Sequence, residues 1–126
     1  MKLKLALAGL MIAVAPTIAF AEGDAVKGKK VFKKCKACHA ADKEKNKVGP
    51  HLVGIIGRAA GSVEKYKYSK GMKAKAAEIG NWDEAKMAEY ITNPKKFLGA
   101  KSKMTFKLKK EDQRNDVIAY LKSLAK

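Results

Sequence analysis

The chain has 126 residues and a formal net charge of +16, from 28 lysines and arginines against 12 acidic residues. This length allows one small domain with a single core. No compact Lys/Arg block with interleaved aromatic residues occurs, which argues against nucleic acid as a partner. An acidic protein surface fits the charge best, and anionic lipid headgroups come next.

The first 21 residues have the features of a secretory signal peptide. Lys2 and Lys4 precede an almost wholly apolar run over residues 5–20, and a small-x-small cleavage pattern ends at Ala21. The apolar run is about 16 residues long, whereas a membrane-spanning helix needs roughly 20. We therefore expect a cleaved signal peptide over residues 1–21, with an uncleaved anchor as the alternative.

The expected mature domain covers residues 22–126, and loss of two leader lysines lowers the formal net charge from +16 to +14. Export predicts a periplasmic location, an oxidising compartment in which paired cysteines usually form disulfides. The chain has two cysteines, Cys35 and Cys38. A disulfide between them would close too small a loop to stabilise a fold much, so another chemistry is expected at this pair.

The first half of the mature domain predicts two helices separated by a loop. Asp24 can cap a helix that continues to Cys35, because apolar residues recur there at helical spacing. The Gly-rich apolar segment 48–57 indicates a buried loop. A short helix is expected over residues 69–79, ended by Gly80.

The second half predicts two more helices. A cap within residues 81–84 begins a helix that reaches Thr92 and stops at Asn93-Pro94, because the residue before a proline disfavours the α region. Residues 95–108 are expected to be mostly loop, and residues 110–124 form an amphipathic helix. The pattern predicts an all-α fold whose thin apolar core leaves room for another group in the middle.

The chemistry is concentrated in Cys35-Lys36-Ala37-Cys38-His39. A redox dithiol normally has a βαβ context, which the pattern lacks. A zinc site could count both cysteines, His39 and His51, but adjacent Cys38 and His39 cannot easily reach one tetrahedral ion. The third interpretation is covalent haem attachment, in which both cysteines form thioethers and the following histidine binds the iron.

Six segments, in this order, resemble the class I c-type cytochromes, especially the cytochrome c2 branch near mitochondrial cytochrome c. They are 35–39 (CKACH), 49–54 (GPHLVG), 66–69 (YKYS), 93–97 (NPKKF), 103–106 (KMTF) and 118–121 (IAYL). The resemblance covers nearly the whole mature chain. It implies three main helices, further short helices and long loops wrapped around one covalent haem c.

The resemblance also implies the iron ligands. His39 would be the proximal ligand, and the Pro50 carbonyl would accept its Nδ1–H bond. Met104, in a loop between two helices, matches the family's second ligand. Met87 is expected to pack within its helix and Met72 to lie at the surface. The rival ligand His51 is expected to be a surface residue.

Residues around the haem propionates follow from the same resemblance. Tyr68, Trp82 and Ser102 would donate hydrogen bonds to the propionates, and Arg58 would lie nearby. Buried Trp and Tyr need a hydrogen-bond acceptor in any case, so they can also be ordinary core aromatics. Tyr90 would lie beside the methionine ligand. Where the first and last helices cross, Gly28 and Phe32 would meet Val117 and Tyr120.

The resemblance implies a soluble, monomeric, periplasmic one-electron carrier that is not an enzyme. Its donor would be a membrane quinol–cytochrome c reductase, and its acceptor a photosynthetic reaction centre or a terminal oxidase. Acidic faces of these complexes would dock on lysines around the haem edge. These lysines are 33, 34, 36, 95, 96, 101, 103 and 107. Association with the membrane surface would be transient, and no nucleic acid would be bound. The alternatives are a haem enzyme such as a peroxidase, a gas-binding haem protein, or a domain cleaved from a larger enzyme.

Overall fold

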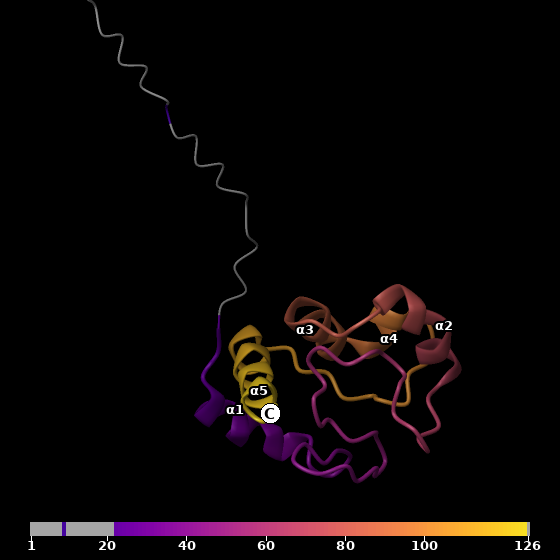
Figure 1. Cartoon of the computed structure of the whole chain (residues 1–126), viewed down its shortest axis with the longest axis horizontal. Coiled ribbons are helices and arrows are strands. Elements are labelled where there is room, and N and C mark those ends of the chain that lie inside the picture. The colour runs from indigo at the N-terminus through magenta and orange to yellow at the C-terminus, as the bar shows by residue number, and fades with distance from the viewer. Residues whose placement is uncertain (1–8, 10–21, 126) are drawn as a thin grey trace, which may run out of the picture.

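The computed structural model describes residue 9 and residues 22–125 (Figure 1). Apart from residue 9, the predicted signal peptide lies outside the described residues. Residues 22–125 form α1 (Ala25–Val31), a 3-10 helix η1 (Phe32–Lys34), α2 (Lys70–Ile79), α3 (Glu84–Thr92), α4 (Pro94–Leu98) and α5 (Glu111–Ser123). This part of the chain contains isolated β-bridges but no strand, which confirms the all-α prediction.

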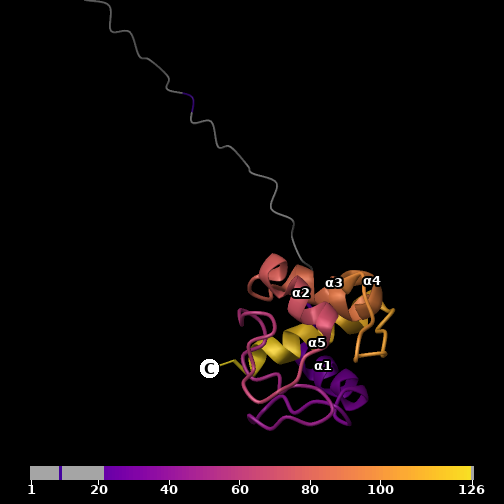
Figure 2. The same cartoon turned by 90° about the vertical axis from the view of Figure 1, so that its right-hand side faces the viewer.

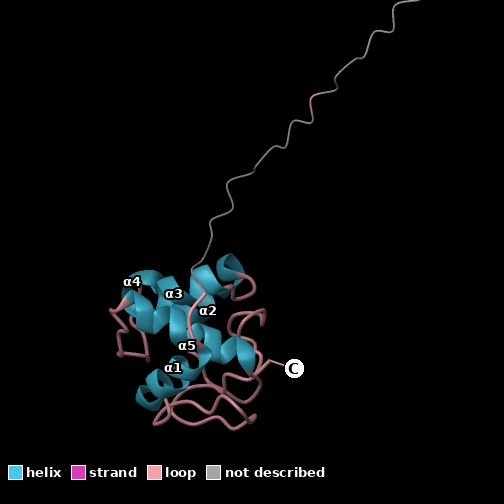
Figure 3. Cartoon of the chain, turned by 90° about the vertical axis from the view of Figure 1, so that its left-hand side faces the viewer, coloured by secondary structure: helices cyan, strands magenta, loops and turns pink. Residues whose placement is uncertain are grey.

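Helices α1 and α5 cross closely, and a glycine makes the approach possible. A Cβ on Gly28 would lie 1.8 Å from the backbone oxygen of Asp116, so only a residue without a side chain fits there. The rings of Phe32 and Tyr120 pack beside this crossing with centroids 5.6 Å apart. Figures 2 and 3 show α5 between α1 on one side and α2, α3 and α4 on the other.

The helix ends follow the local signals in the sequence. The Asp24 carboxylate accepts the backbone N–H groups of the first turn of α1. Ser69 accepts the N–H of Met72 at 3.1 Å and caps α2, and Gly80 ends that helix with a φ of 67°. The Asp83 carboxylate caps α3. Each cap satisfies N–H groups that the helix itself leaves without partners.

The segment after Asn93 differs from the prediction. Residues 95–108 were expected to be mostly loop, but Pro94–Leu98 forms the helix α4. Asn93 does end α3, and its side chain then accepts the N–H of Lys96 at 3.2 Å to cap the next helix. Proline suits the first helical position because its missing N–H is not needed there. Gly99, with a φ of 64°, ends α4 and begins the loop that contains Met104.

The core is built around a cavity. The rings of Trp82, Tyr90 and Phe97 pack against one another in tilted and edge-to-face arrangements, with centroids 5.2 to 5.9 Å apart. Beside them lies a cavity of about 310 Å³ that is lined by residues of η1, α2, α3 and α5 and of the loops between them. The thin core that the sequence predicts therefore has a space at its centre. Within residues 22–125 no helix is long and apolar enough to cross a membrane.

Candidate functional site

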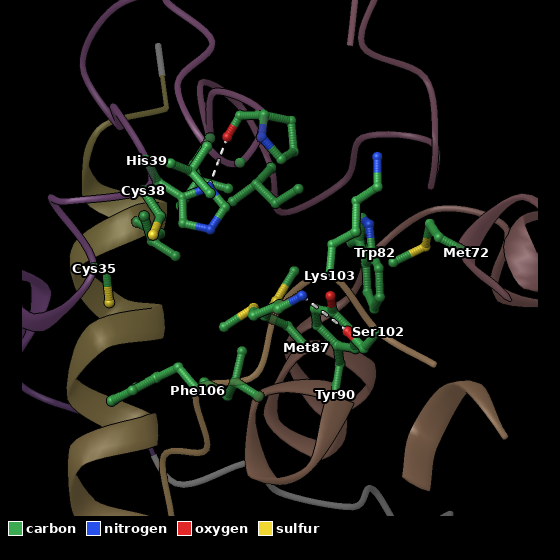
Figure 4. Close-up of a pocket in the computed structure, with 18 of the residues that line it drawn as sticks. Cys35, Cys38, His39, Met72, Trp82, Met87, Tyr90, Ser102, Lys103 and Phe106 are labelled. Carbon is green, nitrogen blue, oxygen red and sulfur yellow. Dashed lines mark hydrogen bonds between the residues drawn. The ribbon is translucent and has the colours of Figure 1, made fainter. Parts of the chain in front are cut away.

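The cavity brings together residues that are far apart in the sequence (Figure 4). Its walls are mostly apolar, with Phe32, Leu52, Ile55 and Leu108 among them. Every residue that the sequence assigned to the site lines it: Cys35, Cys38, His39, Pro50, Arg58, Tyr68, Trp82, Ser102 and Met104. His51, the rival ligand, does not line it.

The two cysteines lie at the end of the first helical segment. The N–H of Cys35 donates to the Phe32 carbonyl, and the N–H groups of Cys38 and His39 both donate to the Cys35 carbonyl. This tight turn places the side chains of Cys35, Cys38 and His39 at one cavity. Both thiols are free and half-buried. The spacing of the motif along the sequence therefore brings both thiols and the imidazole to the same cavity.

The electrostatics of Cys35 disfavour a redox role for this thiol. Burial, reinforced by Cys38, raises the pKa of Cys35 to about 11, although Lys34 lowers it slightly. A reactive redox cysteine needs the opposite shift, because the thiolate is the nucleophile. Among residues 22–125 no group of three His, Cys, Asp or Glu side chains is arranged to hold a metal ion. The zinc interpretation also loses His51, whose ring nitrogen accepts the Val53 N–H at 3.3 Å.

His39 is held in one orientation. Its Nδ1 lies 2.7 Å from the carbonyl oxygen of Pro50, which is the hydrogen bond that the resemblance predicts. Burial lowers the pKa of His39, and the positive charges of Arg58 and Lys47 lower it further, against the opposing effect of the Pro50 bond. The imidazole is therefore neutral at pH 7, with the Nδ1 proton donated to Pro50. Its Nε2 lone pair is left available on the cavity side (Figure 4).

Gly49 packs directly against the His39 ring, and a side chain at this position would collide with the ring. A Cβ on Gly49 would lie 2.2 Å from His39 Cε1 and 2.7 Å from Nδ1. The Gly49 backbone cannot easily move away, because its N–H donates to the Cys38 carbonyl and its carbonyl accepts from Lys47. The Gly-rich loop was expected to be buried, and Gly49 and Ile55 are. Val48, however, is 71% exposed at the edge of the cavity.

Three methionines line the cavity: Met72, Met87 and Met104. The prediction that Met72 lies at the surface is wrong, since its side chain is 8% exposed and turned inward from α2. Met87 is buried in α3, as predicted. Met72 and Met87 both belong to the hydrophobic core, whereas Met104 is half-buried in the loop and its N–H donates to Ser102 Oγ at 3.1 Å. Thioether sulfur is a soft ligand suited to haem iron.

Arg58 is a half-buried cation with an unused buried donor. Its Nη1 donates to the carbonyls of His51 at 2.9 Å and Val53 at 3.1 Å, and burial lowers its pKa. Its Nε is buried without a hydrogen-bond partner among the described residues. Buried polar groups are normally paired, so an Arg lining an apolar cavity with a free N–H indicates a missing acceptor, such as a carboxylate.

Further donors lie near Arg58. The Tyr68 oxygen accepts the Val63 N–H at 3.0 Å, which leaves its own proton free to donate. Trp82 is 4% exposed and contributes an indole N–H to the same wall. Burial raises the pKa of the Tyr90 phenol, which also lines the cavity. This mixture of apolar wall, buried donors, two thiols and N and S ligands fits a flat macrocycle that carries an iron and two carboxylates.

One contact at the cavity edge was not predicted. The Tyr66 hydroxyl donates to the Val48 carbonyl at 3.0 Å, and the Lys103 ammonium lies 5.7 Å from the Tyr66 ring centroid while donating to the Lys67 carbonyl. Tyr66 therefore links the loop beside His39 with the loop that contains Met104. The sequence predicts a cavity contact for Tyr68 in the segment 66–69 but none for Tyr66.

Comparisons with known proteins agree with this geometry. A family model described as "Cytochrome c" matches residues 25–125. A Rhodospirillum rubrum protein named cytochrome c2 is 46% identical over 121 residues, covering 90% of each chain. Cytochrome c-550 of Novispirillum itersonii is 46% identical over 110 residues, covering 81% of this chain and 99% of its own. A solved structure of cytochrome c2 from Rhodospirillum centenum superposes with a TM-score of 0.78 at 37% identity, covering 82% of this chain and all of that one.

Proposed function

The chain belongs to the cytochrome c family, in the class I c2 branch, and from this premise we propose that it is a soluble periplasmic one-electron carrier. As an electron-carrier cytochrome it binds one covalent haem c. Its proposed donor is a membrane quinol–cytochrome c reductase, and its acceptor is a photosynthetic reaction centre or a terminal oxidase. It makes and breaks no bond in a substrate.

We assign the haem contacts to the residues of the cavity. Cys35 and Cys38 form the two thioethers, and His39 Nε2 is the proximal iron ligand. The bond from Nδ1 to Pro50 fixes the imidazole ring and strengthens it as a donor. Arg58, Tyr68, Trp82 and Ser102 surround the propionates, and the unpaired Nε of Arg58 supports this assignment.

Met104 is the proposed second iron ligand. Met72 and Met87 already fill the core, so their sulfurs serve packing, whereas Met104 lies outside that cluster and is presented by a loop held through Ser102. The haem iron supplies the one-electron oxidation and reduction. The soft thioether and the largely apolar cavity favour the reduced state, which raises the reduction potential.

The observation that carries this proposal is the convergence of two free thiols and an oriented, neutral imidazole on one apolar cavity. Extraction with acidic acetone tests it. We expect the colour to stay with the protein, because thioethers survive acid. Release of the haem into the organic phase would contradict the assignment of Cys35 and Cys38.

We further propose that lysines around the cavity edge dock the acidic faces of the redox complexes. All eight lysines named from the sequence are exposed, and Lys34 and Lys103 line the cavity itself. Charge attraction of this kind raises encounter rates by roughly ten- to a thousand-fold at low salt. The contacts are transient, and the carrier works as a monomer.

Salt dependence tests the docking proposal. The Debye length shrinks from about 30 Å at 0.01 M to about 8 Å at 0.15 M ionic strength, so the bimolecular rate of electron transfer should fall steeply. Lys36→Glu, Lys96→Glu and Lys103→Glu should each slow electron transfer far more than Lys45→Glu does. Lys45 is the control because it is exposed and does not line the cavity. Equal effects at all four positions would show that the charge serves solubility alone.

A further inference from the structure

His51 has no role in the proposed haem site, yet it contacts a residue that does. Its side chain is half-buried and does not line the cavity. Arg58, which lines the cavity, donates from Nη1 to the His51 carbonyl at 2.9 Å and to the Val53 carbonyl at 3.1 Å. The same Nη1 lies 3.5 Å from His51 Nδ1. Arg58 therefore connects His51 with the cavity.

The position of the Arg58 guanidinium depends on the segment 51–53. The Arg58 backbone is fixed elsewhere, because its N–H donates to the Ile55 carbonyl at 3.2 Å and its carbonyl accepts the Trp82 N–H at 2.9 Å. Among the described residues, the side-chain hydrogen bonds of Arg58 all go to residues 51–53, and the buried Nε is left for the proposed propionate. A change in this segment would therefore move the positive charge that faces the cavity.

The structure of this segment requires a neutral His51 ring. His51 Nδ1 accepts the Val53 N–H at 3.3 Å, and the His51 backbone N–H donates to Asn46 Oδ1 at 3.0 Å. A proton on Nδ1 would remove the acceptor of the Val53 N–H and would place a second positive charge 3.5 Å from Arg58 Nη1. The charged groups that face the ring are Arg58 and Glu44. Burial lowers the pKa of His51, Arg58 lowers it further, and Glu44 opposes both effects, so the ring gains its proton only in acid.

We propose that His51 is a positioning residue for Arg58 and couples the binding of a solvent proton to the reduction potential of the haem, an inference that rests on the proposed electron-carrier function. Protonated His51 repels the guanidinium toward the cavity and adds a positive charge beside it. Positive charge disfavours the ferric state, which carries one positive charge more than the ferrous state. The reduction potential therefore rises as the pH falls. Because such coupling is reciprocal, oxidation releases part of a proton from His51 to the solvent, and reduction takes it up again.

Equilibration of the haem-loaded protein with a fixed ratio of ferricyanide to ferrocyanide tests the proposal. The visible spectrum gives the ratio of ferrous to ferric protein. Between about pH 8 and about pH 5 this ratio should rise about three-fold, which corresponds to a difference of about half a unit between the pKa values of His51 in the two states. His51→Asn is the matched variant, because its side-chain oxygen can accept the Val53 N–H in the same turn but binds no proton in this range. This variant should lose most of the rise.

A second variant and a second measurement separate His51 from other proton sites. Glu44→Gln removes the exposed acidic group that faces the ring, so the pKa of His51 should fall and the same rise should occur at lower pH. NMR titration of the His51 ring should give a lower pKa in the ferric than in the ferrous protein.

The possible outcomes are distinct. An unchanged rise in His51→Asn would overturn the inference, because the proton would then bind elsewhere, as on the propionates. Equal pKa values of His51 in the two iron states would overturn it as well, even in a protein that exchanges electrons normally. A protein that exchanges no electrons with the couple at any pH would instead overturn the proposed function, and the inference with it.

Discussion

Gly49→Ala should destabilise the protein and disturb the iron site together. Outside the left-handed region, replacing Gly by Ala ordinarily stabilises a protein by about 0.4–1 kcal/mol, because the unfolded chain loses freedom. Gly49 has no such left-handed φ, so backbone strain does not apply. The new methyl group would instead lie 2.2 Å from His39 Cε1, where an ordinary contact begins at 3.4 Å.

The expected loss of stability follows from the displacement of the His39 ring. The Gly49 backbone is held by two hydrogen bonds, so the His39 ring has to retreat by more than 1 Å. That shift breaks the 2.7 Å hydrogen bond between Nδ1 and the Pro50 carbonyl, a loss of about 0.5–1.5 kcal/mol. Overpacking adds about 1–3 kcal/mol, so we expect a loss of about 2–4 kcal/mol in the free energy of unfolding.

Guanidinium denaturation of the oxidised protein, followed together with the visible haem spectrum, measures both effects. Gly54→Ala is the control, because Gly54 has a φ of 63° and open space around it. That control should lose about 1–2 kcal/mol through backbone strain while its haem spectrum stays unchanged. Unchanged or increased stability of Gly49→Ala, with an unaltered spectrum, would refute the packing role assigned to Gly49.

Further predictions concern the helices and the second ligand. Gly28→Ala should destabilise the protein by about 2 kcal/mol despite the better helix propensity of alanine, because its Cβ would lie 1.8 Å from the Asp116 oxygen; a gain in thermal stability would contradict the close crossing. Asn93→Ala should cost about 1 kcal/mol by removing the α4 cap, with Asn93→Asp restoring most of it in the same denaturation assay. Met104→Ala should abolish the weak far-red band of thioether-bound ferric iron, whereas Met87→Leu should keep it; a band that survives in Met104→Ala would refute the ligand assignment.

The features predicted well from sequence are those decided by near neighbours. Asp24, Ser69 and Asp83 cap helices through bonds that span two or three residues, so the local pattern is sufficient. The turn that brings Cys35, Cys38 and His39 together is equally local. These features place the iron-binding motif at the end of α1 and η1 without any knowledge of the tertiary structure.

The features that the sequence does not predict depend on contacts between distant segments, or on residue patterns that fit more than one structure. Asn93-Pro94 was interpreted as a stop, but the same pair also starts a helix when Asn93 caps it. Met72 follows Gly71 in a lysine-rich stretch, and its burial depends on α2 packing close to the segment after α4, where a Cβ on Gly71 would meet Ala100 at 2.9 Å. The contact between Tyr66 and Lys103 joins loops that are far apart along the chain.

The reaction of the reduced protein with carbon monoxide tests the central claim most directly. A one-electron carrier keeps both axial positions occupied, so the spectrum of the native ferrous protein should not change when the gas is added at neutral pH. Met104→Ala, which opens the sixth position, should bind carbon monoxide at once. Rapid binding by the native protein would contradict the account, because it would mean an open iron site suited to gas binding or enzymatic chemistry.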